Sequence, residues 1–415
     1  MSDITNKWQK IKLGDISEVI GGGTPSTKNY DFWDGEIPWL TPKDLSGYKN
    51  RYISRGERNI SEKGLQNSSA RMLPKGTVLL TSRAPIGYLA IAENAVCTNQ
   101  GFKSLVLKDN YLPEFFYYLL KNNIEYIIGM SSGSTFAEIS GKQVKALEFR
   151  VPPLLTQKKI AAVLSALDDK IELNNKINQN LEHQAQAIFK SWFVDFEPFG
   201  GKMPDDWKIG KLKESADRIV CGKTPSTKKV DYYGNDVPFI TIPDMHNNVY
   251  ITKTERSLSV KGANSQANKT IPCNSICVSC IGTAGLVSLT SENSQTNQQI
   301  NSILPKSNIS PYFIYLQMQS LSSSIQMLGA AGSTICNLNK SQFSDMEFLL
   351  PNIDILSKFH DRVKFYFSLI LSNQRENLRL AQLRDALLPK LMSGEIDVSN
   401  VDISDNQISF NFSEV

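Results

Sequence analysis

The sequence predicts an α+β fold in which two pseudo-repeated β-rich domains are separated by two long helices that form an antiparallel coiled coil. Three observations predict this fold: an internal repeat, short apolar runs early in each half, and a heptad pattern that closes each half. At 415 residues the chain is long enough for two or more domains, each with a core of its own. We expect domains at 1–151 and 198–351, long helices at 152–197 and 352–393, and an acidic tail at 394–415.

The repeat is carried by three short motifs that recur in the same order and at nearly the same spacing. Thr24-Pro-Ser-Thr-Lys28 returns as Thr224-Pro-Ser-Thr-Lys228, and Thr98-Asn-Gln100 returns as Thr296-Asn-Gln298. Gly133-Ser-Thr135 likewise returns as Gly332-Ser-Thr334. The two halves of the chain are therefore copies of one structural unit.

Each half begins with strand-like sequence and then turns helical. The runs Gly76-Thr-Val-Leu-Leu-Thr81 and Ser275-Ile-Cys-Val-Ser279 are short, apolar and bounded by turn residues, as is typical of buried strands. Later in each half a proline opens a helix-like segment, at 113–128 and 311–328, where proline is tolerated in the first turn. Mixed α+β domains follow.

Two heptad seams without an internal glycine predict the long helices, and proline enters only at Pro389 in the final turn. The first seam runs through Ile160, Leu164, Leu167, Ile171, Asn174, Asn178, Leu181, Ala185, Ile188 and Trp192. The second runs through Phe359, Val363, Tyr366, Ile370, Asn373, Asn377, Leu380, Arg384, Leu387 and Leu391.

Asparagines occupy the midpoint of both seams. In an antiparallel pair Asn174 can face Asn377 and Asn178 can face Asn373, where buried asparagines cost stability but specify register. The alternative is a wet or partly exposed seam. A seam of about 33 residues spans roughly 50 Å, and one turn of B-DNA is roughly 34–36 Å. Two domains held that far apart could read two half-sites on the same face of DNA.

Charge and composition narrow the function classes. The net charge of +4 hides an acidic tail: no basic residue follows Lys390, and removing the tail's five acidic residues leaves a body of +9. A basic body suits a polyanion, although charge alone is weak evidence. No signal peptide and no apolar run of about 20 residues is present, so we expect a cytoplasmic chain without a membrane partner.

The sequence offers little that could carry catalysis. There is no GxxxxGK[ST] phosphate-binding loop and no Asn/Asp-Pro-Pro-aromatic tetrapeptide of amino-methyltransferases. Only three histidines occur, and two of them fall on the predicted long helices. Cys273, Cys277 and Cys280 supply three of the four ligands that zinc needs, so we favour buried reduced thiols over a metal site. We expect no catalytic and no metal-binding residues.

The repeated motifs are candidate contacts for phosphate. Thr24, Lys28, Thr224 and Lys228 lie in a motif that is either a turn or a phosphate-contacting loop, and one loop can serve as both. Polar loops also carry the candidates Ser134, Thr135, Ser333 and Thr334. For Thr-Asn-Gln we favour buried hydrogen bonding that fixes the fold over base contact. Gly21-Gly-Gly23 is interpreted as a flexible turn.

Over nearly its whole length the chain resembles a known family, the specificity subunits of type I restriction-modification systems. The resemblance rests on Gly22-Gly-Thr-Pro-Ser26, Ile37-Pro-Trp39, Val151-Pro-Pro-Leu154, Gln157-Lys-Lys-Ile160, Phe189-Lys-Ser-Trp-Phe-Val-Asp-Phe196 and Leu387-Leu-Pro-Lys-Leu-Met-Ser-Gly-Glu395. The second half departs from the pattern, with Leu356 where the first has Gln157 and Pro351-Asn352 where it has Pro152-Pro153.

The resemblance implies a non-catalytic, sequence-specific DNA-binding subunit. Each domain would be a DNA target recognition domain that reads one half of a bipartite duplex target. The helices would set the spacer and dock two methyltransferase subunits, and two restriction subunits can join the assembly. S-adenosylmethionine, ATP and Mg would then be bound by partner subunits. The alternative is an assembly scaffold with protein-binding domains and only secondary DNA binding.

Candidate base or phosphate contacts lie in two basic stretches that differ between the halves. Arginine and lysine on projecting loops are typical of groove reading, although a solvated charge or a phosphate contact is the commoner role of any single one. The first half offers Lys43, Arg51, Arg55, Arg58 and Arg83, and the second offers Lys253, Arg256 and Lys261. These stretches diverge more than the sequence around them, as expected if the two domains read different half-sites.

Overall fold

The computed structural model describes residues 8–132, 137–330 and 337–403. The chain divides into two compact units. Unit 1 comprises residues 1–172 and 380–415, and unit 2 comprises residues 173–379. Each unit therefore contains one β-rich domain together with parts of both long helices.

Unit 1 is built on two main sheets and one short ribbon. The five-stranded sheet has the order β2-β9-β6-β7-β4, with β4 parallel to β7 and its other pairs antiparallel. The three-stranded sheet has the order β5-β3-β8, and β1 pairs with β10 in the ribbon. The strands are β1 Gln9–Lys12, β2 Ser17–Gly21, β3 Trp33–Leu40, β4 Tyr52–Ile53, β5 Arg58–Ile60, β6 Val78–Ser82, β7 Ile86–Ala92, β8 Cys97–Thr98, β9 Lys103–Leu107 and β10 Glu148–Val151.

Short helices connect these strands. The predicted helix at 113–128 is two helices, because the chain breaks at Asn123, whose side-chain amide donates to the carbonyl of Leu119. Such a side-chain bond to the preceding turn competes with helix continuation. The helical segments are α1 Leu13–Ile16, η2 Tyr30–Phe32, η3 Pro42–Leu45, α2 Glu62–Gln66, α3 Pro113–Asn122, α4 Ile124–Gly129 and α5 Gly141–Ala146.

Unit 2 repeats this architecture strand for strand. Its sheets have the orders β12-β19-β16-β17-β14 and β15-β13-β18, with a β11-β20 ribbon. The strands are β11 Lys208–Lys211, β12 Ala216–Cys221, β13 Tyr233–Ile240, β14 Tyr250–Ile251, β15 Arg256–Leu258, β16 Ile276–Ser279, β17 Val287–Thr290, β18 Gln295–Thr296, β19 Ile300–Pro305 and β20 Glu347–Leu350. The internal repeat of the sequence is thus a repeat of the fold.

The helical segments of unit 2 follow the same plan. The helix predicted at 311–328 is again two helices, which meet at Leu321. The segments are η4 Glu197–Phe199, η5 Leu212–Glu214, η6 Val230–Tyr232, α7 Ile242–Met245, α8 Val260–Asn264, η7 Ala267–Lys269, α9 Pro311–Ser320, α10 Ser322–Ala330 and α11 Lys340–Ser344.

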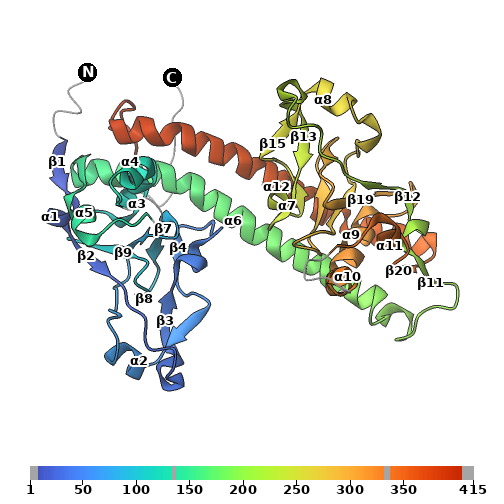
Figure 1. The fold of residues 1–415 in the computed structure, drawn as a ribbon, viewed down its shortest axis with the longest axis horizontal. Coiled ribbons are helices and arrows are strands. Elements are labelled where there is room, and N and C mark those ends of the chain that lie inside the picture. The colour runs from blue at the N-terminus through green and yellow to red at the C-terminus, as the bar shows by residue number, and fades with distance from the viewer. Residues whose placement is uncertain (1–7, 133–136, 331–336, 404–415) are drawn as a thin grey trace. The chain divides into compact units, whose positions relative to one another are not determined.

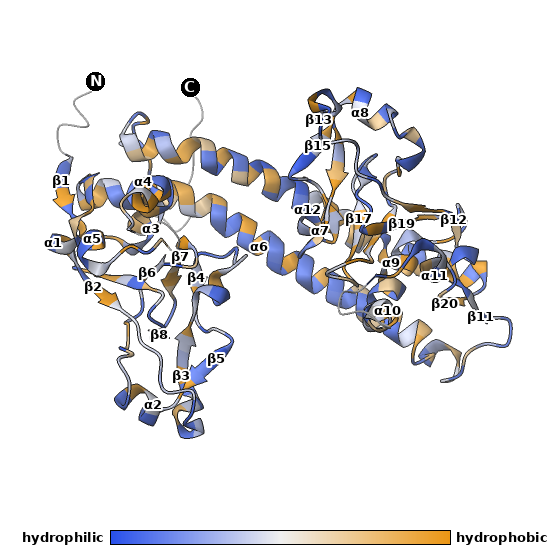
Figure 2. Cartoon of the chain, viewed as in Figure 1, coloured by the Kyte–Doolittle hydropathy of each residue, from blue (hydrophilic) through white to orange (hydrophobic). Residues whose placement is uncertain are grey.

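Two long helices complete the fold, α6 Leu154–Phe193 and α12 Ile353–Ser393 (Figure 1). Apolar and polar residues alternate along both, as expected for helices with one buried stripe (Figure 2). In unit 2 the stripe joins the aromatic core, where the ring of Phe193 lies 4.8 Å from that of Phe313 and 5.0 Å from that of Phe359. None of the helices in the described part of the chain is long and apolar enough to cross a membrane.

The asparagine pairing expected from the heptads is present within unit 2. Asn174 Nδ2 donates to Asn377 Oδ1 at 2.9 Å, and Asn373 Nδ2 donates to Asn178 Oδ1 at 2.8 Å. Asn174, Asn178 and Asn373 are buried, so the alternative of a wet seam is wrong at these positions. The pairing is antiparallel, because the residue numbers rise along α6 as they fall along α12.

Candidate nucleic-acid interface

The two repeated motifs of each half meet in space. The Thr24 hydroxyl donates to Gln100 Oε1 at 2.5 Å, and in unit 2 the Thr224 hydroxyl donates to Gln298 Oε1 at 2.7 Å. Thr98 and Thr296 at the other end of the Thr-Asn-Gln motif are buried. The buried end of the motif serves the fold, as expected, whereas the bond to its glutamine lies at the surface. That bond holds in place the loops 24–28 and 224–228, which we call the polar loops.

The glycines before the polar loop are needed for close approach, not for flexibility. A Cβ on Gly22 would lie 2.1 Å from the carbonyl oxygen of Asn99, and one on Gly222 would lie 2.1 Å from that of Asn297. The Gly23 amide donates to the carbonyl of Thr98 at 2.9 Å. The interpretation of Gly21–Gly23 as a flexible turn is therefore wrong, because Gly22 packs against the Thr-Asn-Gln motif.

Aromatic donors fix the polar loop from behind. The Trp39 indole donates to the carbonyl of Gly23 at 2.9 Å, and the Trp33 indole donates to that of Ser26 at 3.2 Å. In unit 2 the Tyr233 hydroxyl donates to the carbonyl of Pro225 at 3.0 Å. The backbone is thus held inward while the side chains of Lys28 and Lys228 are exposed. A fixed loop that presents a lysine suits contact with a phosphate.

An aspartate in each unit holds the basic stretch beside this loop. Asp44 accepts from the backbone and hydroxyl of Thr41 through Oδ2, and from the backbone of Glu57 through Oδ1. Asp244 makes the same bonds with Thr241 and Glu255. Neither aspartate was among the predicted site residues; the signal that could have found them is that Asp44 and Asp244 recur at the same offset as Thr24 and Thr224.

The basic candidates of unit 1 differ in their availability. Arg55 is exposed, and the guanidinium of Arg58 lies 3.7 Å from the ring centroid of Trp33. Lys43 pairs with Glu57 at 2.7 Å, and that hydrogen bond and charge raise the pKa of Lys43. Arg83 Nη1 lies 3.5 Å from a carboxylate oxygen of Glu138. Arg55 and Arg58 are consequently the better placed of these residues for an external partner.

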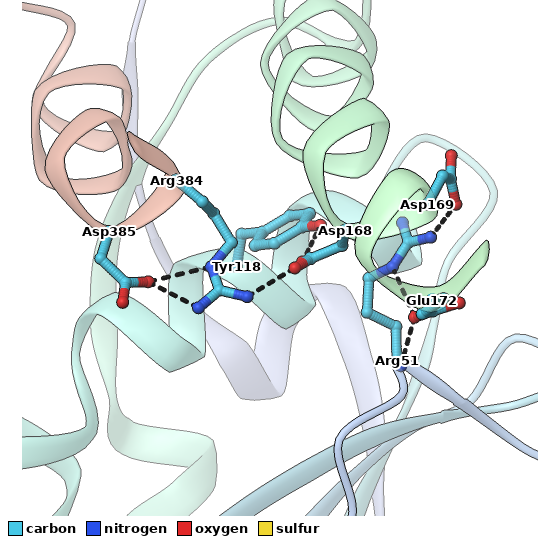
Figure 3. Close-up of polar contacts among 7 residues, drawn as sticks. All are labelled: Arg51, Tyr118, Asp168, Asp169, Glu172, Arg384 and Asp385. Carbon is cyan, nitrogen blue, oxygen red and sulfur yellow. Dashed lines mark hydrogen bonds and ion pairs between the residues drawn. The ribbon is translucent and has the colours of Figure 1, made fainter. Parts of the chain in front are cut away.

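Arg51 corrects the sequence-based expectation of a DNA contact. Its side chain is only 4% exposed and pairs with Asp169 and Glu172 on α6 (Figure 3). Its backbone amide also donates to Glu172 Oε1 at 2.9 Å. Burial would lower the pKa of Arg51, but the neighbouring acidic groups Tyr118, Asp169 and Glu172 raise it above its ordinary value. Arg51 fastens β4 to α6 and is not available to DNA.

A second part of this network ties α3 to both long helices within unit 1. The Tyr118 hydroxyl donates to Asp168 Oδ2 at 2.6 Å, and Arg384 Nη1 lies 2.5 Å from Asp168 Oδ1 (Figure 3). Arg384 also bonds Asp385. The heptad pattern placed Arg384 on the seam but left its partner unassigned. The signal was the antiparallel register of the asparagine pairs, which sets Arg384 opposite Leu167 and so beside Asp168.

The basic candidates of unit 2 lie on the corresponding elements. Lys253 and Arg256 are exposed, before and at the start of β15. Lys261 is exposed and pairs with Asp231 at 2.5 Å; this hydrogen bond and charge raise the pKa of the lysine. The candidates Ser134, Thr135, Ser333 and Thr334 lie outside the described residues.

The cysteine cluster is only partly as expected. Cys277 and Cys280 are buried, and burial raises the pKa of Cys277 to about 12, which keeps it a thiol. Cys273 is exposed, so the expectation of a buried thiol is wrong there: it precedes the buried strand β16. Among the residues that the structure describes, no group of three or more His, Cys, Asp or Glu is placed to hold a metal ion.

A family model and two relatives match this chain, and all three describe specificity subunits of type I restriction systems. Residues 5–183 and 204–380 match the family model described as the type I restriction modification DNA specificity domain. The chain is 36% identical to the MjaIX specificity subunit of Methanocaldococcus jannaschii, over 96% of this chain and 95% of that one. It is also 36% identical to the HindI specificity subunit of Haemophilus influenzae, over 94% of this chain and 99% of that one.

A solved structure, the type I restriction-modification S subunit from M. genitalium, shares the fold with a TM-score of 0.57. It is 16% identical, and the match covers 94% of this chain and 97% of that one. The family model covers most of both repeats, and the two relatives match nearly end to end. The chain therefore belongs to the family of type I restriction-modification specificity subunits.

Proposed function

We propose that each unit reads one half of a bipartite DNA target, and that the chain performs no chemistry itself. The observation that carries the proposal is a common frame that presents exposed cations at matching places in both units. Thr24, Lys28 and their counterparts occupy the same fixed loop in both units, and Arg58 and Arg256 each begin a strand that pairs with β3 or β13. Two copies of one frame that both offer cations suit a protein that contacts the phosphates of two half-sites.

Salt-dependent binding of the full chain to duplex DNA tests this proposal. Replacing Lys28 or Lys228 with alanine should weaken binding about equally for all sequences and reduce the salt slope by about 1. Lys10→Ala is the matched control, because Lys10 is 70% exposed on β1 and belongs to an ion pair outside the polar loop. Binding that is weak and insensitive to salt would instead favour a scaffold with protein-binding domains.

The long helices are proposed to set the spacer between the half-sites. The support is their continuous length and the antiparallel asparagine pairs, which fix their register. One heptad inserted in both helices adds about 10 Å, close to three base pairs at roughly 3.4 Å each. Matched insertions should lengthen the preferred spacer accordingly, and an insertion in one helix alone should disrupt the pairing. An unchanged spacer after matched insertion would refute the proposal that the helices set the spacer.

We further propose that the chain acts in the cytoplasm with two methyltransferase subunits docked on its helices, joined in some assemblies by two restriction subunits. S-adenosylmethionine, ATP and Mg²⁺ would be bound by those partners. The support is membership of the family and the named relatives, which are subunits of restriction enzymes. Methyl transfer to DNA should need this chain together with its partners, and robust transfer by the purified chain alone would overturn the non-catalytic assignment.

A further inference from the structure

Two exposed side chains occupy the same place in the two repeats. Among the large hydrophobic residues of the described chain, Tyr30 at 88% and Val230 at 83% are the most exposed. Each is the first residue of a short 3₁₀ helix, η2 in unit 1 and η6 in unit 2. Each also follows the exposed lysine of the polar loop, Lys28 or Lys228, by two positions.

The backbone that presents these side chains is clamped in the same way in both units. In unit 1 the Ser61 hydroxyl donates to the carbonyl of Asp31 at 2.5 Å, and its amide donates to that of Phe32 at 3.0 Å. A Cβ on Gly64 would lie 2.3 Å from the Phe32 oxygen, so α2 packs directly on η2. The position of Tyr30 is therefore set by its neighbours.

Unit 2 reproduces each of these contacts. The Ser259 hydroxyl donates to the carbonyl of Asp231 at 2.6 Å, and its amide donates to that of Tyr232 at 3.0 Å. A Cβ on Gly262 would lie 1.9 Å from the Tyr232 oxygen. The clamp uses the same residue types in both copies, while the residue it presents changes from tyrosine to valine.

Single exposed apolar residues are common and need no explanation. Here, however, the same fixed position is apolar and almost fully exposed in both units, beside a lysine suited to phosphate. Folding does not use these side chains, because so little of either surface is buried. The chemistry that would use them is an apolar contact with a base edge, such as the thymine methyl group in the major groove.

We propose that Tyr30 and Val230 are specificity-determining contacts, each meeting a base edge in its own half-site. This inference rests on the proposed DNA-reading function. The tyrosine adds a ring face and a hydroxyl where the valine offers methyl groups alone, so the two positions read different bases. The neighbouring Lys28 and Lys228 bind the adjoining phosphates and bring the two side chains against the groove.

The test uses the full chain and duplexes that carry its target sequence. That sequence is identified by sequencing the methylated adenines of the host DNA. Tyr30→Ala and Val230→Ala should each weaken binding to the target duplex roughly tenfold. Binding to unrelated duplexes and the salt slope should not change, because no phosphate contact is lost. The matched controls are Met72→Ala in unit 1 and Ile209→Ala in unit 2, exposed apolar residues on other elements that should leave binding unchanged.

Giving unit 1 the side chain of unit 2 distinguishes recognition of a base from non-specific contact with DNA. In the complete methyltransferase complex, Tyr30→Val should change the base preferred at one position of one half-site and leave the other half-site as it was. Equal weakening on every duplex, or an unchanged methylation pattern with unchanged affinity, would overturn the inference. If the unaltered chain showed no salt-dependent preference for its target, the proposed function would fail first, and this inference with it.

Discussion

Replacing Arg384 with methionine should destabilise unit 1 while leaving the apolar stem of the side chain in place. The side chains of Arg384 and Asp168 are only 15% and 7% exposed. Removing one partner of a buried ion pair leaves an uncompensated charge and costs about 3–5 kcal/mol. Asp168 keeps its bond from Tyr118, so we expect the lower end, about 3 kcal/mol.

The assay is a urea titration read by hydrogen exchange in α3, which lies in unit 1 and carries Tyr118. A loss of about 3 kcal/mol corresponds to exchange roughly 10²-fold faster in α3. With a slope of about 3 kcal/mol per molar urea, the midpoint should fall by about 1 M. The matched control is Lys390→Met on the same helix and in the same unit, whose ion pair with Glu395 is exposed and should therefore contribute little to stability.

A triple variant isolates the cause. Arg384→Met with Asp168→Leu and Tyr118→Phe removes the charges and the donor together, and should recover most of the lost stability. Unit 2 already has buried apolar residues at the equivalent positions of its long helices, Ala185 for Arg384 and Phe367 for Asp168. A shift below 0.3 M for Arg384→Met (about 1 kcal/mol), or a triple variant as unstable as the single one, would refute the argument from an unpaired buried charge.

Three further predictions concern the seam, the polar loop and the alkaline limit. Asn178→Leu with Asn373→Leu should raise the thermal midpoint of unfolding, because Asn178 Nδ2 is buried without a partner among the described residues. The same double variant should form mixed oligomers, measured by light scattering, because the helices lose their register. Gly22→Ala should abolish soluble folding, judged by circular dichroism, whereas Gly21→Ala should be tolerated, because a Cβ on Gly21 meets nothing closer than 3.9 Å. Burial, and then the charge of Asp168, raise the pKa of Tyr118 in the folded chain. The contribution of Tyr118 to the free energy of unfolding is therefore fully present below its unfolded pKa of about 10 and is lost as the pH rises above that value. Tyr118→Phe should reduce this loss of stability in urea titrations at pH 9–11.

Much of the architecture could be predicted because it depends on local pattern. A repeat is visible wherever motifs recur, and a heptad seam is visible because helical periodicity links residues three and four apart. The facing of Asn174 with Asn377 followed from alignment of the two seams, and hydrogen bonds between them are present. The breaks at Asn123 and Leu321 were missed. At Asn123 the reason is that a side-chain bond to one preceding carbonyl leaves no periodic trace in the sequence.

The sequence by itself determined that this protein has two copies of one α+β unit, paired long helices, and polar loops at matched places. Only the tertiary structure decided which charges of the basic stretches are exposed to a partner. Arg51 and Arg55 are neighbours in one basic stretch, yet the first is buried against α6 and the second is exposed. The reason is physical: burial depends on which distant surface packs against a residue, and Asp169 and Glu172 reach Arg51 only after the chain has folded back on itself.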